Sequence, residues 1–173
     1  MKKLEEVFNC NKCNLCKNQK PLLDNKTDCD VMWVGLSAKK VSNVIESIPL
    51  SNDTNSGKII ELIENKLPNI NFYKTNLVKC VPLNENLKLR YPTNNEMNFC
   101  INNLIYEIEI LKPKIIFILG KKSYDFINKY FFENKIDRAK LVYIEHPSYI
   151  YVYKRKYIDD YINKVVDICL EKI

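Results

Sequence analysis

Three cysteines stand within seven positions near the start of the chain, in the stretch CNKCNLC (residues 10–16). Cys10 and Cys13 form a CxxC pair; 66 residues separate Cys13 from Cys80, and 19 separate Cys80 from Cys100. Four thiolates suit either a tetrahedral zinc ion or a cubane [4Fe–4S] cluster, and the spacing does not choose between them. The alternative is that Cys80 and Cys100 are buried apolar thiols.

Three further cysteines bring the total to seven, an odd number. Cys16 could replace a ligand of the first pair, whereas Cys29 and Cys169 are interpreted as structural. The N-terminal stretch MKKLEEVFN has no apolar run of the kind that a secretory signal needs. We therefore expect a cytoplasmic protein whose thiols stay reduced, and no disulfide framework.

The composition predicts one folded domain over residues 1–173, with a cysteine-bearing loop at 10–30. Apolar residues make up 46% of the 173 residues, which is enough for a substantial core. No apolar run is long enough to cross a membrane, and we expect a monomer. The net charge of +6 is compatible with DNA as a partner, although many basic proteins bind no nucleic acid.

Apolar runs typical of buried strands alternate along the chain with segments of helical periodicity. The expected strands cover 30–35, 71–78, 114–120 and 140–146, and the expected helices cover 1–9, 56–67, 94–112, 121–132 and 153–172. This alternation predicts a three-layer α/β/α fold around a central, mostly parallel four-stranded sheet. In such folds the functional site lies at the carboxyl ends of the strands, here Gly35, Asn76 to Lys79, Gly120 and His146.

Six segments in order resemble the family 4 uracil-DNA glycosylases, iron–sulfur enzymes of the uracil-DNA glycosylase superfamily: CNKCNLC, DVMWVG, KTNLVKCVP, RYPTNNEMNFC, LKPKIIFILG and HPSYI. The resemblance implies hydrolysis of the N-glycosidic bond of a base flipped out of DNA, leaving an abasic site without lyase chemistry. It also implies that Cys10, Cys13, Cys80 and Cys100 hold a structural [4Fe–4S] cluster, with zinc as the less favoured occupant. The interval between the last two cysteines is longer than usual, which indicates an inserted loop around NENLKLR.

Two polar residues acquire roles from this resemblance. His146, the only histidine in the chain, lies in HPS and would donate a hydrogen bond to the leaving base. Asn76, in TNLVKC, would read the edge of the base with its amide. Without the resemblance, they would be interpreted as a partly buried histidine and an asparagine that caps a strand end.

The loop after the first strand, GLSAKK, departs from the family. Gly35 is kept, but Leu36 stands where the family has an acidic residue. Asp53 is the candidate replacement acid, although an aspartate before a threonine is also common in helix capping. Ser51 and Asn52 could hold a water instead. The expected substrate contacts are completed by Gly35, Leu36, Ser37, Leu50 and Ser148.

Leu50 stands where the family has a phenylalanine that stacks on uracil. A leucine there widens the pocket and weakens stacking, which favours a bulkier modified base over plain uracil. Such an activity would serve DNA repair or defence against phages that modify their DNA.

The segment that follows His146, PSYIYVYKRKY, is expected to grip DNA as a loop. Its wedge candidates are Tyr149, Ile150 and Tyr151, and its phosphate contacts are Lys154, Arg155 and Lys156. Lys39 and Lys40 could hold a phosphate beside the target base. The alternative for the segment is a solvated helix start with core aromatics, and for the two lysines simple solvation.

Two other functions remain open from the sequence. A catalytically inactive iron–sulfur relative that binds DNA would explain the missing acid at Leu36. An iron–sulfur electron carrier would use the same cysteines, but their wide spacing and the pocket motifs argue against it.

Overall fold

The computed structural model describes residues 4–173. Its strands are β1 (Val31–Ser37), β2 (Phe72–Val78), β3 (Ile115–Leu119) and β4 (Leu141–Ile144). Its helices are α1 (Glu5–Phe8), α2 (Asn55–Asn65), α3 (Asn94–Leu111), α4 (Lys121–Glu133), α5 (Pro147–Tyr153) and α6 (Ile158–Lys172). Two short 3₁₀ helices, η2 (Asn14–Lys17) and η3 (Arg155–Tyr157), complete the described elements.

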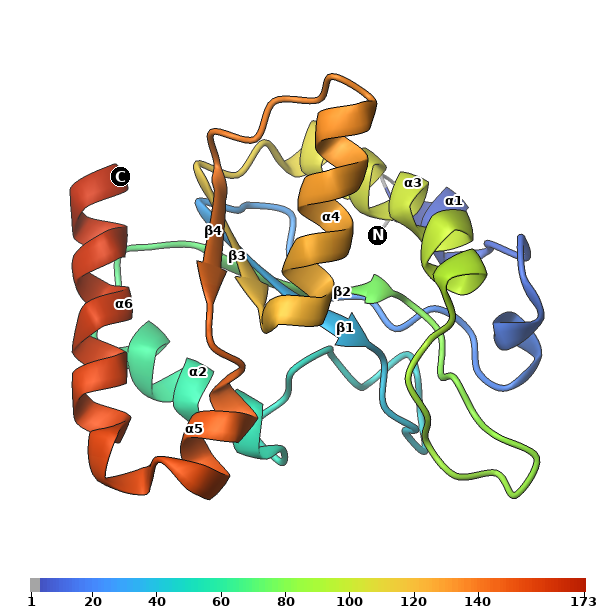
Figure 1. Ribbon diagram of the computed structural model, residues 1–173, viewed down its shortest axis with the longest axis horizontal. Helices are drawn as coiled ribbons and strands as arrows, with labels where there is room; N and C mark the ends of the chain where they lie inside the picture. The colour runs from blue at the N-terminus through green and yellow to red at the C-terminus, as the bar shows by residue number, and fades with distance from the viewer. Residues whose placement is uncertain (1–3) are drawn as a thin grey trace.

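The four strands form one parallel sheet in the order β2-β1-β3-β4 (Figure 1). The central strands β1 and β3 are apolar along almost their whole length, as expected for strands covered on both faces. The predicted mostly parallel four-stranded sheet is thus confirmed.

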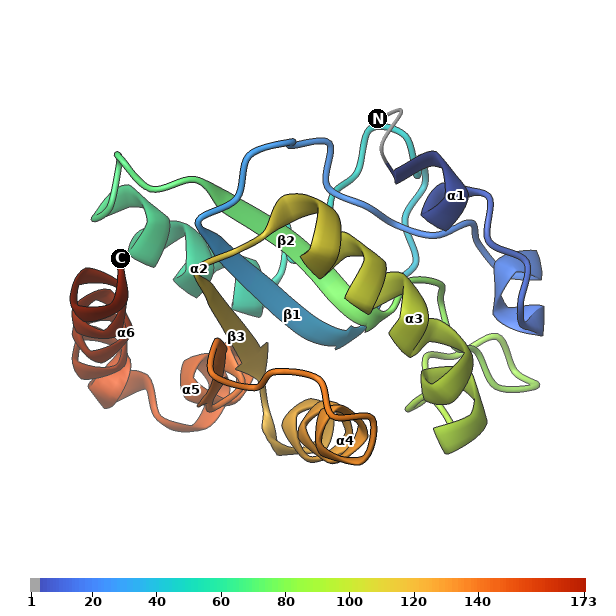
Figure 2. The ribbon, with the colours of Figure 1, turned by 90° about the horizontal axis from the view of Figure 1, so that it is seen from above.

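Helices cover both faces of the sheet and make the three predicted layers (Figure 2). One core cluster joins α1, α3 and α4 to one face of the sheet. The other joins α2, α5 and α6 to the opposite face, where the ring of Trp33 stacks between Phe72 and Phe117. In Figure 2 the strands lie between α2 and α6 on the left and α3 and α4 on the right.

Local caps set where two helices begin. The Thr54 hydroxyl accepts a hydrogen bond from the Gly57 N–H (3.0 Å) at the start of α2. A reciprocal capping box between Thr93 and Glu96 starts α3. With these caps, α2 and α3 both begin close to the carboxyl edge of the sheet.

The chain after His146 differs from the expected loop, because residues 147–153 form α5. Pro147 occupies the first turn, where its missing N–H costs nothing, and His146 caps the helix through its side chain. The helix expected over 153–172 is interrupted at Lys154, and α6 begins at Ile158. At the other end, the expected helix at 1–9 is confined to Glu5–Phe8, and residues 1–3 lie outside the described part. None of the helices within 4–173 is long and apolar enough to cross a membrane.

Candidate active site and cysteine pocket

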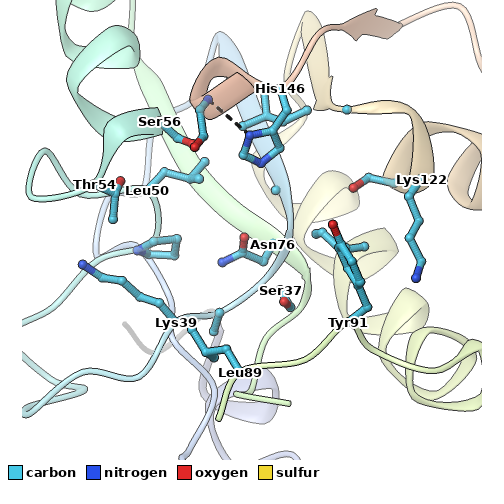
Figure 3. Close-up of a pocket in the computed structure, with 18 of the residues that line it drawn as sticks. Ser37, Lys39, Leu50, Thr54, Ser56, Asn76, Leu89, Tyr91, Lys122 and His146 are labelled. Atoms are coloured by element: carbon cyan, nitrogen blue, oxygen red, sulfur yellow. Dashed lines mark hydrogen bonds between the residues drawn. The ribbon is translucent and has the colours of Figure 1, made fainter. Parts of the chain in front are cut away.

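The carboxyl ends of all four strands open onto one cavity of about 780 Å³ (Figure 3). Gly35 to Ser37 reach it from β1, Asn76 from β2, Gly120 from the end of β3, and His146 from the turn after β4. The sequence therefore located the edge of the sheet at which polar side chains converge.

Asn76 lies in the middle of this cavity, below His146 in the view of Figure 3. Its side chain is 3% exposed, yet its amide takes part in none of the hydrogen bonds found among residues 4–173. A Cβ on Gly35 would lie 2.3 Å from the Asn76 Oδ1, so the glycine makes the room that the amide occupies. A confined amide with free donor and acceptor groups is suited to read a ligand edge.

His146 caps α5 and presents its other ring nitrogen to the cavity. Its Nδ1 accepts a hydrogen bond from the Ser148 N–H (3.3 Å; dashed line in Figure 3). Burial lowers the pKa of the imidazole below its ordinary value of 6.5, so the ring is neutral at pH 7. Because Nδ1 accepts, the proton of the neutral ring lies on Nε2, which is therefore a donor.

Gly120, at the end of β3, allows His146 to approach closely. It has φ of +85°, a backbone conformation that residues with a side chain rarely adopt. A Cβ at this position would lie 3.3 Å from the Cβ of His146. The strand-to-helix turn after β3 therefore needs a glycine both for its backbone and for the approach of the imidazole.

No aspartate or glutamate lines this cavity within the part of the chain that the structure describes. Leu36 and Leu50 are apolar wall residues, as their types predict. The polar wall groups other than the amide, the imidazole and the basic side chains are hydroxyls, namely Ser37, Thr54, Ser56, Ser123, Ser148, Tyr91, Tyr149 and Tyr153.

Asp53 lies in a second, neighbouring cavity of about 560 Å³, together with Lys40, Ser51 and Asn52. Its carboxylate is paired with the Lys39 ammonium and accepts a hydrogen bond from the Ser51 hydroxyl. Lys39 and Ser51 hold the pKa of this carboxyl below its usual range. Asp53 thus lies outside the cavity that holds His146, with its charge paired to Lys39, and the structure does not bring the predicted acid to the imidazole.

The residues of α5 divide between core and surface. Ile150 is 2% exposed and packs against the sheet, so it is wrong as a wedge. Tyr149 is half-exposed on the cavity rim, and its ring lies 5.3 Å from that of Tyr153. Tyr151 is partly buried against the core, with the Arg155 guanidinium 5.0 Å from its ring centroid. Lys154 is paired with the Glu145 carboxylate (2.8 Å).

Sequence reasoning missed the wall that faces Leu50 and Lys39 across the cavity. It consists of Tyr91 and Lys122, with the Lys122 Nζ 4.5 Å from the Tyr91 ring centroid, while Leu89 lines the lower edge of the cavity in the view of Figure 3. Leu89 and Tyr91 belong to or directly follow the segment NENLKLR, which the sequence analysis interprets as an insertion, so the unusual cysteine interval was the signal that could have located them. Val152 and Tyr153 on α5, and the hydroxyl residues Thr54, Ser56 and Ser123, are further wall residues that sequence reasoning missed.

The segment at 83–91 is held in a defined shape. Leu83 and Leu89 form a β-bridge, and the backbone between them turns around the side chain of Asn84. Two hydrogen bonds join the Arg90 guanidinium to the Glu96 carboxylate (2.8 and 2.5 Å) at the start of α3. Leu89 and Tyr91 therefore stand on an anchored support rather than on a free loop.

A narrow third pocket collects Cys10 and Cys13 from the N-terminal loop, Cys80 from just after β2, and Cys100 from α3. The four cysteines that the sequence singled out are thus brought together. Within 4–173, the structure has no group of three or more Cys, His, Asp or Glu side chains that could hold a metal ion. Figures 1 and 2 place the N-terminal loop beside the first turns of α3.

The polar groups around these thiols fit a bound cationic group. The Lys79 N–H donates to the Cys100 Sγ (3.3 Å), as does the Asn103 amide at a longer distance (3.9 Å). Donors of this kind stabilise a thiolate. Burial raises the pKa of Cys80, and the neighbouring Cys100 and Cys13 raise it further, so a cation bound at this place would have to displace the protons of these thiols.

The other three cysteines have different surroundings. Cys16 lines the same pocket but donates its S–H to the carbonyl oxygen of Cys13 (3.1 Å). Burial raises the pKa of Cys29 to about 12 and that of Cys169 to about 11, and both lie outside the pocket. These two thiols stay protonated, as expected for structural cysteines.

Residues 19–168 match the family model of the uracil DNA glycosylase superfamily. Three archaeal proteins named type-4 uracil-DNA glycosylase are similar in sequence. The protein from Saccharolobus solfataricus is 30% identical over 130 residues, which are 72% of this chain and 57% of that protein. The Sulfurisphaera tokodaii protein is 29% identical over 159 residues, which cover 89% of this chain and 68% of that protein. The Archaeoglobus fulgidus protein is 24% identical over 196 aligned residues, which cover 98% of this chain and 92% of that protein.

The chain thus spans little more than half of the first of these relatives. Among solved structures, the crystal structure of SMUG2 from Pedobacter heparinus is similar in fold, with a TM-score of 0.63 at 17% identity. That likeness covers 83% of this chain and 76% of the other.

Proposed function

Because this chain belongs to the uracil-DNA glycosylase superfamily, we propose that it hydrolyses the N-glycosidic bond between a base and deoxyribose in DNA. The observation that carries the proposal is the convergence of the free Asn76 amide and the neutral His146 ring in one cavity at the carboxyl edge of the sheet. A base inside a duplex cannot reach such a cavity, so it has to be flipped out of the stack.

His146 is proposed to assist the departure of the base. When the bond from C1′ to the base nitrogen breaks, its electron pair goes to the base and the sugar acquires oxocarbenium character. The Nε2–H of His146 donates to the negative charge that develops on the base, and a donor held in place before the reaction is effective for this. Water then adds to C1′ and loses a proton, and the departed base anion takes up a proton, which leaves an abasic sugar and the free base.

Hydroxyl groups take the place of a carboxylate in positioning the water. The described cavity wall contributes Ser37, Thr54, Ser56 and Ser148 but no acid. Stabilisation of the leaving base therefore carries a larger share of catalysis than it would beside a carboxylate. The rival function, an inactive relative that binds DNA, is favoured by the same absence and is decided by the experiment below.

Asn76 is proposed to read the base, and the surrounding walls indicate a base larger than uracil. The volume of about 780 Å³ lies in the range of pockets that enclose drug-sized ligands, roughly 300–1,000 Å³. Leu50 on one wall is smaller than a phenylalanine, while Tyr91 on the facing wall offers an aromatic ring to the cavity. We infer a modified base whose substituent extends between these two walls.

The DNA is proposed to be gripped at the rim of the cavity. Tyr149, Val152 and Tyr153 are exposed apolar side chains of α5 that could fill the gap left by a flipped base. Lys40, Arg155 and Lys156 would contact phosphates around it, and Lys39 and Lys154 would do so on leaving Asp53 and Glu145. Ile150, which is buried in the core, and Tyr151, which packs partly buried against that core, would support this surface without contacting DNA.

Cys10, Cys13, Cys80 and Cys100 are proposed to hold a [4Fe–4S] cluster, with zinc as the alternative. Their supply from three separate segments, and the N–H donors on Cys100, support this assignment. The cluster supplies no step of the reaction and acts as a crosslink between the N-terminal loop, β2 and α3. We further infer a single-domain, monomeric, cytoplasmic protein that acts in DNA repair or phage defence.

The test is base release by protein purified without oxygen. Duplexes carrying uracil, and natural DNAs carrying modified cytosines or purines, are incubated with wild-type protein and with His146→Ala. Alkali then converts abasic sites into strand breaks, and chromatography identifies the released base. Breaks that require His146 are expected with at least one modified base. DNA binding without release from any substrate would establish the inactive relative instead, and release of uracil alone would overturn the larger-base inference.

A further inference from the structure

A lysine and a glutamate form a fully buried ion pair behind the base-reading residue. Lys79 follows β2 and Glu107 lies on α3; both side chains have 0% exposure. Buried ion pairs contribute little net stability, because removing two charges from water offsets most of their attraction. The stability of the fold therefore does not by itself account for a charged pair at this place.

Every group of the pair is directed by a neighbour. The Lys79 ammonium donates to the Glu107 carboxylate, to the Thr75 hydroxyl (2.7 Å) and to the carbonyl oxygen of Asn76 (2.7 Å). The carboxylate in turn accepts hydrogen bonds from the Tyr73 hydroxyl (3.0 Å) and from Thr75 (3.0 Å). The three donors of the lysine are thus used by acceptors that fix its direction.

One of these acceptors belongs to the proposed base reader itself. The amide of Asn76 is free for a ligand, so its direction depends on its main chain and on the walls around it. Gly35 limits the amide from one side, and the Lys79 ammonium fixes the carbonyl of the same residue from the other. The backbone of Lys79 is fixed as well, since its N–H donates to the Cys100 Sγ (3.3 Å).

We propose that Lys79, with Glu107 as its counter-charge, is a positioning residue that holds Asn76 in the orientation that reads the base. It touches neither the base nor the sugar and acts through the main chain of Asn76. The inference rests on the proposed glycosylase function, because orientation of Asn76 matters only if a base binds there. Misplacement of a reading group by an ångström is costly for a rate while leaving general DNA contacts intact.

The chain offers a matched control on β2, the strand that precedes Lys79. Lys74 and Glu64 form a second, largely buried ion pair (2.9 Å) whose carboxylate accepts a hydrogen bond from the Trp33 indole. This pair makes no hydrogen bond to Asn76. Lys79→Met with Glu107→Gln, and Lys74→Met with Glu64→Gln, therefore remove the same charges while each glutamine keeps an acceptor for its neighbours.

The experiment compares these two double variants with wild-type protein, each with its metal content verified. For Lys79→Met/Glu107→Gln, single-turnover base release is expected to fall about 10- to 100-fold, with DNA affinity within about twofold of wild type. Discrimination between the preferred base and other bases should shrink in parallel. The control double variant is expected to keep the wild-type rate and selectivity. Hydrogen–deuterium exchange should accelerate at residues 75–80 only in the Lys79 variant.

Each other outcome is informative. Wild-type rate and selectivity in the Lys79 variant would overturn the positioning role while leaving the glycosylase function in place. If wild-type protein releases no base, the proposed function fails. Unchanged hydrogen–deuterium exchange at residues 75–80 in the Lys79 variant would separately overturn the proposal that Lys79 fixes the main chain of Asn76. Should the double variant not fold, Thr75→Val removes one hydrogen-bond partner of Lys79; a loss of selectivity without a loss of DNA affinity is then required.

Discussion

The backbone of Gly35 and the side-chain amide of Asn76 lie in such close contact that any side chain at position 35 would displace the amide. A Cβ there would lie 2.3 Å from the Asn76 Oδ1 and 3.3 Å from a methyl group of Leu50. The two residues face each other across the pairing of β1 with β2. This contact confines the amide in the centre of the cavity, where it is free to meet a ligand.

Gly35→Ala is therefore expected to impair the site more than the fold. The methyl group forces Asn76 or Leu50 to move, which costs about 1–3 kcal/mol of folding stability as overpacking. The rate of base release should fall about 100-fold, as expected for a reading group displaced by an ångström. Urea denaturation and single-turnover assays on the same preparation measure the two effects. An unimpaired rate would contradict the confinement of Asn76 by Gly35.

His146→Asn removes the donor proposed to face the leaving base. Loss of one preorganised donor is expected to slow base release about 10²- to 10³-fold. DNA affinity should stay near the wild-type value, because the ring lies inside the cavity rather than on its rim. Single-turnover kinetics and a fluorescence-anisotropy titration with the same duplex separate the two. A matched loss of affinity would place His146 in DNA binding instead.

The single histidine also permits a direct measurement of its protonation. Burial lowers the pKa of His146 from 6.5, so the folded protein should show a neutral Nε2–H imidazole at pH 7 and a titration midpoint below 6.5. Tag-free protein has one pair of imidazole ¹⁵N signals, which report both the tautomer and the midpoint. A midpoint above 6.5 would contradict the buried, capping arrangement with Ser148.

The same lowered pKa makes stability depend on pH in a defined direction. Below pH 6.5 the unfolded chain binds a proton at His146 before the folded protein does, so acidification favours the unfolded state. The stability present above pH 6.5 is thus lost as the pH falls towards the folded-state pKa. Melting temperatures at pH 7.5 and 5.5 should differ less for His146→Asn than for wild type. An identical difference would assign the whole dependence to other groups.

The cysteines should fall into two classes under substitution. Cys80→Ser or Cys100→Ser is expected to abolish binding of the metal group and to lower the melting temperature, because the crosslink between β2, α3 and the N-terminal loop is lost. Cys29→Ser and Cys169→Ser serve as matched controls that should retain the bound metal group. Iron, sulfide and zinc analysis with visible absorption measures the outcome. About four irons per chain indicate a cubane cluster, whereas one zinc indicates the alternative.

Tyr91→Ala should change base selectivity without affecting the fold. The side chain is 73% exposed and lies across the cavity from Leu50, where it can stack on a substituted base. Loss of one stacking partner costs about 1–3 kcal/mol, or roughly 5- to 150-fold in kcat/KM for the preferred base. Tyr91→Phe keeps the ring and should retain most activity. Equal losses for every base would instead indicate a general role in holding DNA.

The order of residue types along the chain was sufficient to predict the sheet, the layers and the edge where polar residues converge. Hydrophobic runs of strand length and helical periodicity are local properties, and parallel strands must bring their carboxyl ends to one edge. Gly35, Asn76 and His146 could therefore be assigned to one cavity from their positions in the sequence, and the family likeness brought the four cysteines together.

The packing of the elements was needed to find which neighbours complete the site. Whether Asp53 reaches His146 depends on the path of the 39–53 segment. In the structure the Asp53 carboxylate is paired with the Lys39 ammonium and lines the neighbouring cavity. Ile150 turns inward because Pro147 starts a helix, whose periodicity places that position against the sheet. Tyr91 and Glu107 stand far in sequence from the residues they approach. Contacts of this kind depend on tertiary structure, which local sequence patterns do not encode.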